Sequence, residues 1–168
     1  MSSKKRREDI IKILMESNRA IKGTEFASLF NVTRQIIVKD IAILRAEGKS
    51  IIATPDGYIY RKDNNKIKAI IAVNHDSNDT IKELEIVVKY GGIIEDVIIE
   101  HPLYGEIRGN LMIKNLNDLN KFESEFKSKE VKPLSNLTNG VHLHTIAADS
   151  QEYIEAIKRE LKDSGFLL

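Results

Sequence analysis

The sequence predicts an α+β protein with two domains, the first built from three helices and a β-hairpin, the second from a mostly antiparallel sheet covered by helices. Helix-like segments are grouped at the start, whereas strands and helices alternate later. Charge is divided in the same way. Residues 1–65 contain 13 Lys and Arg against 8 Asp and Glu, a net charge of +5, and the remainder contains 13 against 17, a net charge of −4. We therefore expect domains at 1–63 and 64–168, of which only the first suits a polyanion; chance segregation of surface charge is the alternative.

The composition indicates an ordinary globular protein without cysteine chemistry. Hydrophobic residues make up 42% and charged residues 30% of the 168 residues, as in most globular domains. The absence of cysteine excludes disulfides, thiolate metal sites and cysteine nucleophiles. The start, MSSKKRREDIIKILMES, has no apolar core or cleavage site of a secretory signal, and no apolar run approaches the roughly 20 residues that cross a bilayer. We expect a cytoplasmic location and no membrane partner.

Three segments of the first domain have the apolar spacing of helices. The first runs over residues 7–17. TEFASLF follows, with Thr24 as the expected N-cap. TRQIIVKDIAILRAEG predicts a third helix that Thr33 caps and Gly48 ends. Its expected core positions are Ile36, Ile37, Ile41 and Leu44.

A helix, a short turn and a longer helix are the layout of a helix-turn-helix, in which the second helix of the pair enters the DNA major groove with its N-terminal residues first. KSIIATPDGYIYRK predicts a hairpin around the turn PDG, which makes the domain a winged helix-turn-helix. We expect contacts to double-stranded DNA from this leading turn and from the basic start of the chain, at Lys5, Arg6, Thr33, Arg34, Gln35 and Lys39. A three-helix scaffold for protein contacts, or one part of a larger enzyme, is the alternative.

The second domain begins after the turn-rich stretch KDNNK. Strands are expected at KIKAIIAVNH, IIEDVIIEH, GEIRGNLMI and VHLHTIAAD. Helices are expected at SNDTIKELEIVVKYGG, at NLNDLNKFESEFKSKE with Leu116, Leu119, Phe122 and Phe126 on one side, and at SQEYIEAIKRELKDSG with Tyr153, Ile154, Ile157 and Leu161 inward. This order implies helices on one face of a largely antiparallel sheet. The sequence contains no glycine-rich phosphate loop and no serine nucleophile motif.

Two of the four histidines, His142 and His144, lie two positions apart in an expected strand. They should project from one face, because side chains i and i+2 of a strand share a side. Two imidazoles placed in this way suit a transition metal such as Zn, Ni, Fe or Mn, although a solvated strand face has the same spacing. Further ligands would come from His75 and His101 at strand ends, or from Glu83 and Glu85, between which the residues alone do not decide.

The whole chain resembles a family of regulators in which a helix-turn-helix precedes a 3H domain, named for its histidines. This family includes niacin-responsive repressors of bacterial NAD-precursor uptake and synthesis genes. The resemblance is carried by TRQIIVKDIAILRAEG and GYIY in the first domain, and by AVNHDSNDTIKELEIVVKYGG, DVIIEHPLYGEIRGNL and GVHLHTI in the second. The helix-turn-helix motif is generic, whereas NH…E, HPLYG and HLHT in this order are more specific.

The resemblance implies a divalent transition metal (Ni, Zn, Fe or Mn) held by His75, Glu83, His142 and His144, and a small carboxylate effector such as nicotinate that completes its shell. His101, Tyr104, Gly105 and Arg108 would lie near the effector, where an arginine suits a carboxylate. The expected protein is a homodimeric repressor that binds operator DNA with niacin as corepressor, and not an enzyme. The alternative is a metalloenzyme acting on a small pyridine amide or carboxylate, with an appended DNA-binding module. A weaker alternative makes the metal itself the signal.

Overall fold

The computed structural model describes residues 1–62 and 65–168. The chain divides into two compact units, Met1–Asn64 and Asn65–Leu168, and each is described by itself. The boundary expected between residues 63 and 64 lies outside the described residues. Among the described helices, none is long and apolar enough to cross a membrane.

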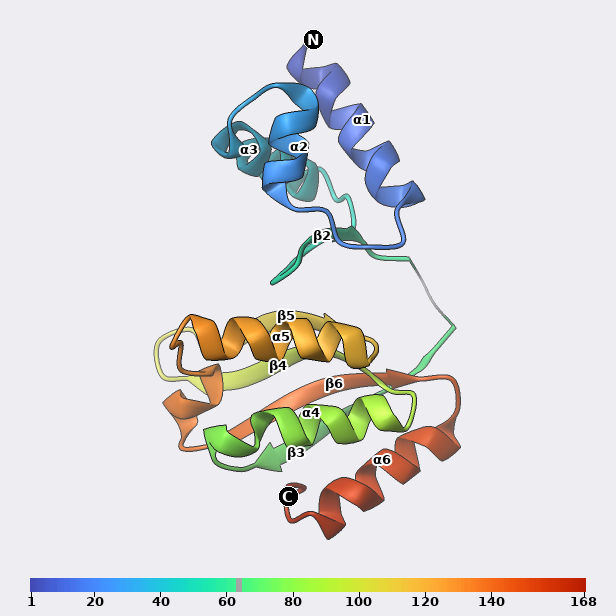
Figure 1. Ribbon diagram of the computed structural model, residues 1–168, viewed down its shortest axis with the longest axis vertical. Coiled ribbons are helices and arrows are strands. Elements are labelled where there is room, and N and C mark those ends of the chain that lie inside the picture. The colour runs from blue at the N-terminus through green and yellow to red at the C-terminus, as the bar shows by residue number, and fades with distance from the viewer. Residues whose placement is uncertain (63–64) are drawn as a thin grey trace. The chain divides into compact units, whose positions relative to one another are not determined.

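The first unit contains the helices α1 (Ser3–Glu16), α2 (Gly23–Phe30) and α3 (Arg34–Ala46), then the antiparallel strands β1 (Ile51–Thr54) and β2 (Gly57–Tyr60) (Figure 1). Apolar side chains from all of the helices and from β1 meet in one core, which includes Ile10, Leu14, Phe26, Ile37, Ile41, Leu44 and Ile51. Ile21 pairs with Tyr58 and so joins the α1–α2 connection to the hairpin. The predicted winged helix-turn-helix is confirmed.

Short polar side chains and a glycine set the ends of α1 and α3. The Thr33 hydroxyl accepts a hydrogen bond from the Ile36 N–H (3.4 Å), so Thr33 is the N-cap that the sequence predicts. After α3 the backbone turns through Gly48, whose φ of 82° is the left-handed conformation that glycine adopts without strain. Helix α1 begins earlier than predicted, because the Ser2 hydroxyl accepts from the Lys5 N–H (3.2 Å).

The N-cap predicted for α2 is wrong. The helix begins at Gly23, directly after Lys22. The Lys22 N–H donates to Glu25 Oε1 at 3.0 Å, so a carboxylate one turn into the helix satisfies this end, as in a capping box. Thr24 therefore lies inside the helix and does not cap it.

A buried carboxylate joins α1 to α3. Asp40 of α3 is buried between the two helices. The Arg6 Nε donates to Asp40 Oδ2 at 2.6 Å, and Arg7 Nη1 lies 3.6 Å from Oδ1. A carboxylate in this position is costly unless an opposite charge compensates it. The arginines therefore fix where α1 crosses α3.

The second unit has the predicted order of strands and helices. It consists of β3 (Ile67–Asn74), α4 (Thr80–Lys89), β4 (Ile93–His101), β5 (Gly105–Ile113), α5 (Leu116–Ser128), β6 (Val141–Ala148) and α6 (Gln151–Asp163), with 3-10 turns η1 (Ser77–Asp79) before α4 and η2 (Leu134–Thr138) before β6. The sheet order is β3-β6-β4-β5, and all neighbouring strands are antiparallel. Helices α4, α5 and α6 share one core with one face of this sheet (Figure 1).

The sheet order places β6 in the middle of the unit. The chain passes from β3 through α4 to β4 and leaves a space between these strands, which β6 fills later. The register pairs Ile71 with His144 and Val73 with His142. Both histidines of β6 therefore lie beside the end of β3, which His75 follows.

Three apolar residues that spacing assigns to helix cores are exposed: Ile36 (38%), Leu116 and Tyr153 (46%). Ile36 precedes the buried Ile37, and Tyr153 precedes the buried Ile154. Each residue advances about 100° around a helix, so the neighbour of a core residue can lie outside the buried stripe. Leu116 is the first residue of α5 and lies beyond its packed turns.

We expect Asp40→Asn to destabilise the first unit by about 2 kcal/mol, because it leaves Arg6 and Arg7 partly buried without a counter-charge. Faster amide hydrogen exchange in α1 and α3 would measure the loss. The control is Asp9→Asn, which removes only an i,i+4 pair with Lys5 (3.0 Å) and should cost less than about 0.5 kcal/mol. Unchanged protection of α1 in Asp40→Asn would contradict this role of the ion pair.

Candidate metal centre and nucleic-acid interface

The two histidines of β6 point into the second unit. His142 is 4% exposed and His144 is 3% exposed, whereas Val141, which directly precedes His142, faces solvent. The alternative that these histidines lie on a solvated strand face is therefore wrong. Side chains i and i+2 of a strand share a side, so both rings lie on the same face of the sheet. This is the face that the helices cover.

Helix α4 adds an acidic side chain at the same place. Glu83 is 0% exposed, while Glu85, two positions further on, faces solvent. Two residues turn a helix by about 200°, so the two side chains lie on nearly opposite faces. The packing of α4 on the sheet thus brings Glu83, and not Glu85, to the histidines.

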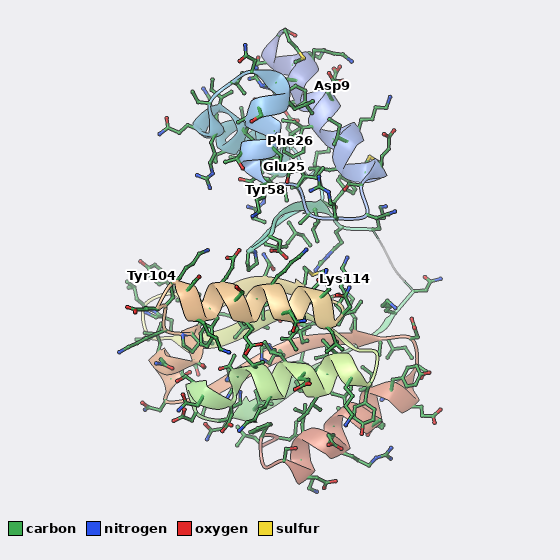
Figure 2. All side chains as sticks on the ribbon, viewed as in Figure 1. Asp9, Glu25, Phe26, Tyr58, Tyr104 and Lys114 are labelled. Atoms are coloured by element: carbon green, nitrogen blue, oxygen red, sulfur yellow. The ribbon has the colours of Figure 1, made fainter. Side chains whose placement is uncertain are left out.

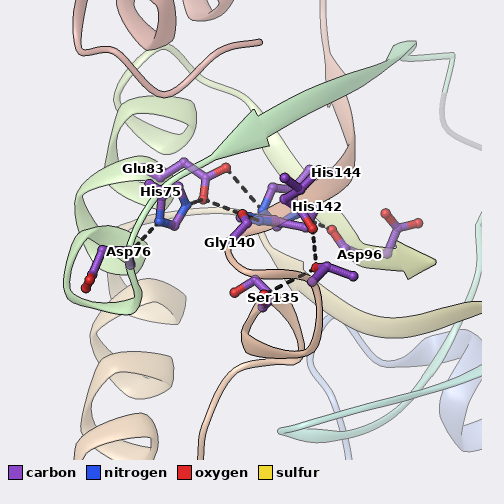
Figure 3. Close-up of polar contacts among 10 residues, drawn as sticks. His75, Asp76, Glu83, Asp96, Ser135, Gly140, His142 and His144 are labelled. Carbon is purple, nitrogen blue, oxygen red and sulfur yellow. Dashed lines mark hydrogen bonds and ion pairs between the residues drawn. The ribbon is translucent and has the colours of Figure 1, made fainter. Parts of the chain in front are cut away.

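Imidazole rings surround the carboxylate of Glu83 (Figure 3). His75 Nε2 lies 2.5 Å and His142 Nε2 lies 3.4 Å from Glu83 Oε2. His144 Nε2 lies 3.1 Å from Oε1. The structure therefore gathers the predicted ligand set from the end of β3, from α4 and from β6.

Each of these rings is held by its other nitrogen. Nδ1 donates to a backbone carbonyl in every case: His75 to Asp76 (2.7 Å), His142 to Gly140 (2.8 Å) and His144 to Asp96 (2.5 Å) (Figure 3). A carbonyl oxygen only accepts, so Nδ1 carries the proton and the Nε2 of a neutral ring presents a lone pair. Metal-binding histidines have this arrangement, in which the outer hydrogen bond fixes the ring and its tautomer.

The electrostatics of the cluster favour a cation. Burial by itself raises the pKa of Glu83, but the charge of His144 and the hydrogen bonds with His142 and His75 outweigh it and hold this pKa well below its usual range. Burial lowers the pKa of His75 and of His144, but their pairing with Glu83 raises both above the ordinary imidazole value. The cluster therefore keeps its carboxylate ionised and attracts either protons or a metal ion that displaces them.

Two buried polar atoms of the cluster make no hydrogen bond within residues 1–62 and 65–168: Glu83 Oε1 and His144 Nε2. They lie 3.1 Å apart, but their geometry is not that of a hydrogen bond. Buried polar atoms without a partner are rare and need an explanation. A divalent metal would satisfy both atoms, and imidazole with carboxylate is a ligand set that such metals accept. The residues therefore fit a metal.

The ligand atoms are not all equally close. Those of His75, Glu83 and His142 lie within 4.8 Å of one another, as a metal requires. His144 stands outside this group, although its ring faces the same carboxylate.

Gly140 allows β6 to approach the end of β3. Its φ is 96°, and a Cβ there would lie 2.5 Å from the carbonyl oxygen of His75. Only glycine fits, and its own carbonyl orients His142. The sequence prediction missed Gly140, although its position two residues before His142 was a signal. It also missed the carbonyls of Asp76 and Asp96, for which the side chains give no signal.

A cavity of about 570 Å³ adjoins the cluster. It lies where β4 ends and where β5 and β6 begin, and its walls include Ile98, Ile99, Glu106, Thr138, His142 and Leu143. His142 belongs both to this wall and to the cluster. The volume is that of pockets which bind small organic ligands.

Two of the residues predicted to lie near an effector come from β5. Gly105 lines this cavity. Arg108 was expected to bind a carboxylate of the effector, but its guanidinium contacts the carboxylates of Asp96 and Glu106. The structure therefore places Arg108 among acidic groups of its own unit.

The other two predicted residues, His101 and Tyr104, lie in the β4–β5 hairpin and are not part of the cavity wall. The Nδ1 of His101 accepts a hydrogen bond from the Tyr104 N–H (3.3 Å). The Tyr104 side chain is exposed at the edge of the unit (Figure 2). Their contacts are those of a tight turn.

Four of the residues predicted to contact DNA lie on or just before the first turns of α3, and all are exposed: Thr33, Arg34, Gln35 and Lys39. The opposite side of α3 is buried in the core. Helix α3 therefore presents a polar, basic face of the kind that reads a major groove.

The two predicted contacts in α1 differ from each other. Lys5 is exposed and pairs with Asp9. Arg6 is largely buried, and its Nε is bound to Asp40. Its guanidinium is thus engaged within the protein.

Each unit of the chain matches a known domain family. Residues 6–59 match a helix-turn-helix domain, and residues 68–168 match the 3H domain. The chain belongs to the 3H domain family. It is 42% identical, over 97% of its length and 93% of the relative, to a Thermotoga maritima protein named probable transcription repressor NiaR. It is 35% identical, with the same coverage of both chains, to the transcription repressor NadR of Bacillus subtilis.

The family predicted from the motifs is confirmed. A third relative, an uncharacterized protein of Methanothermus fervidus, is 32% identical over 59% of this chain, which is 17% of that protein. The two relatives that match almost the whole chain, and so align with both of its domains, are named as repressors. This 3H-family member is therefore a DNA-binding transcription repressor and not an enzyme.

We expect Glu83→Gln to weaken Ni(II) or Zn(II) binding by more than about 100-fold, beyond the 10–100-fold typical of changes outside the ligand shell. Glutamine keeps the shape of the side chain and removes the charge that attracts the cation. Calorimetric titration of the metal-free protein measures this. The matched control is Glu85→Gln, on the same helix but exposed, which should bind like the wild type. Equal affinities for the two variants would rule out Glu83 as a ligand.

Proposed function

We propose that this protein is a metal-containing repressor that senses nicotinate and controls genes of NAD-precursor uptake or synthesis. The observation that carries the proposal is the buried cluster of His75, Glu83, His142 and His144 beside a cavity, in a chain whose other unit is a winged helix-turn-helix. We expect it to act in the cytoplasm, where operator DNA is found. The names of the relatives support repression; the effector and the metal are our proposals.

His75, Glu83, His142 and His144 would hold the metal through three Nε2 atoms and one carboxylate. Imidazole and carboxylate suit Ni, Zn, Fe or Mn. Four protein ligands leave open positions on a five- or six-coordinate ion, and the chemistry supplied there is Lewis-acid binding of a small carboxylate. The carbonyls of Asp76, Gly140 and Asp96 keep the rings aligned for this role.

The effector would occupy the cavity that His142 lines. Ile98, Ile99 and Leu143 provide an apolar wall for a flat ring, and Thr138 offers a hydroxyl. Because Arg108 is already paired with Asp96 and Glu106, the carboxylate of nicotinate is better satisfied at the metal than at this arginine. We therefore propose the metal, and not Arg108, as the group that binds the carboxylate.

Repression would depend on linkage between the effector and DNA. Nicotinate acts as a corepressor if it binds the DNA-competent state more tightly than the other state, and it then raises operator affinity by the same factor. A homodimer would present two α3 helices to half-sites about one helical turn, or a multiple of it, apart.

We expect nicotinate to raise the affinity of the metal-loaded protein for a promoter fragment of a niacin-uptake gene by about 5- to 150-fold, the usual range of allosteric coupling. Fluorescence anisotropy of labelled DNA, with nicotinate titrated at fixed salt, measures it. Nicotinamide is the control for the carboxylate. Unchanged operator affinity with nicotinate would refute the sensing proposal, and loss of DNA binding on chelation alone would favour the metal as the signal.

We expect Arg34→Ala to lower operator affinity by about 1–3 kcal/mol, because the residue lies at the leading turn of α3. The matched control is Arg45→Ala, at the other end of the same exposed helix face, which should change the affinity less than about 2-fold. If the two variants lose affinity equally, α3 does not enter DNA with its N-terminus first.

A further inference from the structure

Strand β4 is irregular beside the cluster. Its pairing with β5 shifts register between Ile94 and Asp96, and its pairing with β6 shifts between Ile94 and Ile98. Glu95 and Asp96 lie within this irregular stretch, and both are buried. Bulges of this kind occur next to functional sites, where they redirect a residue. Asp96 is the residue of this stretch that contacts the segment carrying His144.

Asp96 contacts β6 at two successive residues. Its backbone carbonyl accepts the hydrogen bond from His144 Nδ1 (2.5 Å), and its Oδ1 accepts from the Thr145 N–H (2.8 Å). Its Oδ2 is bound by the guanidinium of Arg108 on β5. The side chain therefore fixes the bulge of β4 against the segment of β6 that carries His144.

His144 depends on this contact more than the other histidines depend on theirs. His75 and His142 donate to carbonyls one and two residues away in their own segments, at Asp76 and Gly140. The acceptor of His144 comes from a different strand, 48 residues away in sequence. The orientation of the His144 ring thus follows the position of the bulge. His144 is also the residue that stands outside the close group of ligand atoms.

We propose that Asp96 is a positioning residue of the metal centre. Its carboxylate, bound to Thr145 and Arg108, holds the bulge where the Asp96 carbonyl keeps His144 in the tautomer and direction that a metal needs. Arg108 supports this arrangement from β5. The proposal rests on the metal proposed for the cluster and adds a residue that is not a ligand.

The test is Co(II) binding to the full chain with Asp96→Ala and Asp96→Asn, since the visible absorption of bound Co(II) reports its coordination geometry. Alanine keeps the carbonyl but removes the side-chain contacts, so we expect about 10- to 100-fold weaker binding and an altered spectrum. Asparagine keeps an oxygen for the Thr145 N–H, so its affinity and spectrum should lie between alanine and wild type. If the alanine variant does not fold, the asparagine variant alone decides, with circular dichroism confirming its fold.

The matched control is Glu95→Gln, at the same bulge, whose carboxylate contacts Lys68 on β3 at 2.8 Å. It should keep wild-type affinity and spectrum. Wild-type Co(II) affinity and spectrum in the folded Asp96 variants would overturn the positioning role while leaving the metal centre intact. A wild-type chain that binds neither Co(II) nor Ni(II) would overturn both.

Discussion

The charge of one buried carboxylate constrains the whole second unit. Glu83 is fully buried on α4, and a carboxylate in such a place costs several kcal/mol unless opposite charge compensates it. The compensation comes from His75, which follows β3, and from His142 and His144, which reach the carboxylate because β6 inserts between β3 and β4. The backbone acceptors of the rings serve the same end, since they direct the Nε2 atoms at the carboxylate. A metal ion would take over this compensation, so the fold and the proposed sensing site depend on the same charge.

The first unit contains a buried carboxylate as well, but a different partner gives it a different role. Asp40 is compensated by Arg6 and Arg7, and guanidinium groups remain charged at every physiological pH. That pair is therefore permanent and fixes how α1 and α3 cross. The partners of Glu83 are imidazoles, a side-chain class that also binds transition metals. The chain thus compensates one buried carboxylate with permanent charges and another with the side chains of the proposed metal site.

The faces of the helices were predicted less well than the helices themselves. The elements of both units follow from local patterns, such as the Thr33 cap and the glycine after α3. Two residues assigned to helix cores, Ile36 and Tyr153, are exposed neighbours of buried residues. An apolar residue at the edge of the buried stripe of a helix fits the helical spacing as well as one within the stripe, so spacing alone does not separate the two. The prediction that Thr24 caps α2 was wrong because the helix begins one residue before it, at Gly23, and the Glu25 carboxylate accepts the hydrogen bond from the Lys22 N–H at this end.

The sequence by itself determined the winged helix-turn-helix, the order of strands and helices, the pairing of His142 and His144 on one strand face, and the family. These depend on periodicity and on short motifs, which are local properties. Only the tertiary structure buried Glu83 with the histidines and left Glu85 exposed, paired Arg108 with Asp96, and made the carbonyl of Asp96 part of the site. These features depend on which strands become neighbours and where the bulge of β4 falls. Contacts between segments 48 or more residues apart, such as Asp96 with His144 or Glu83 with His142, leave no periodic pattern in the chain.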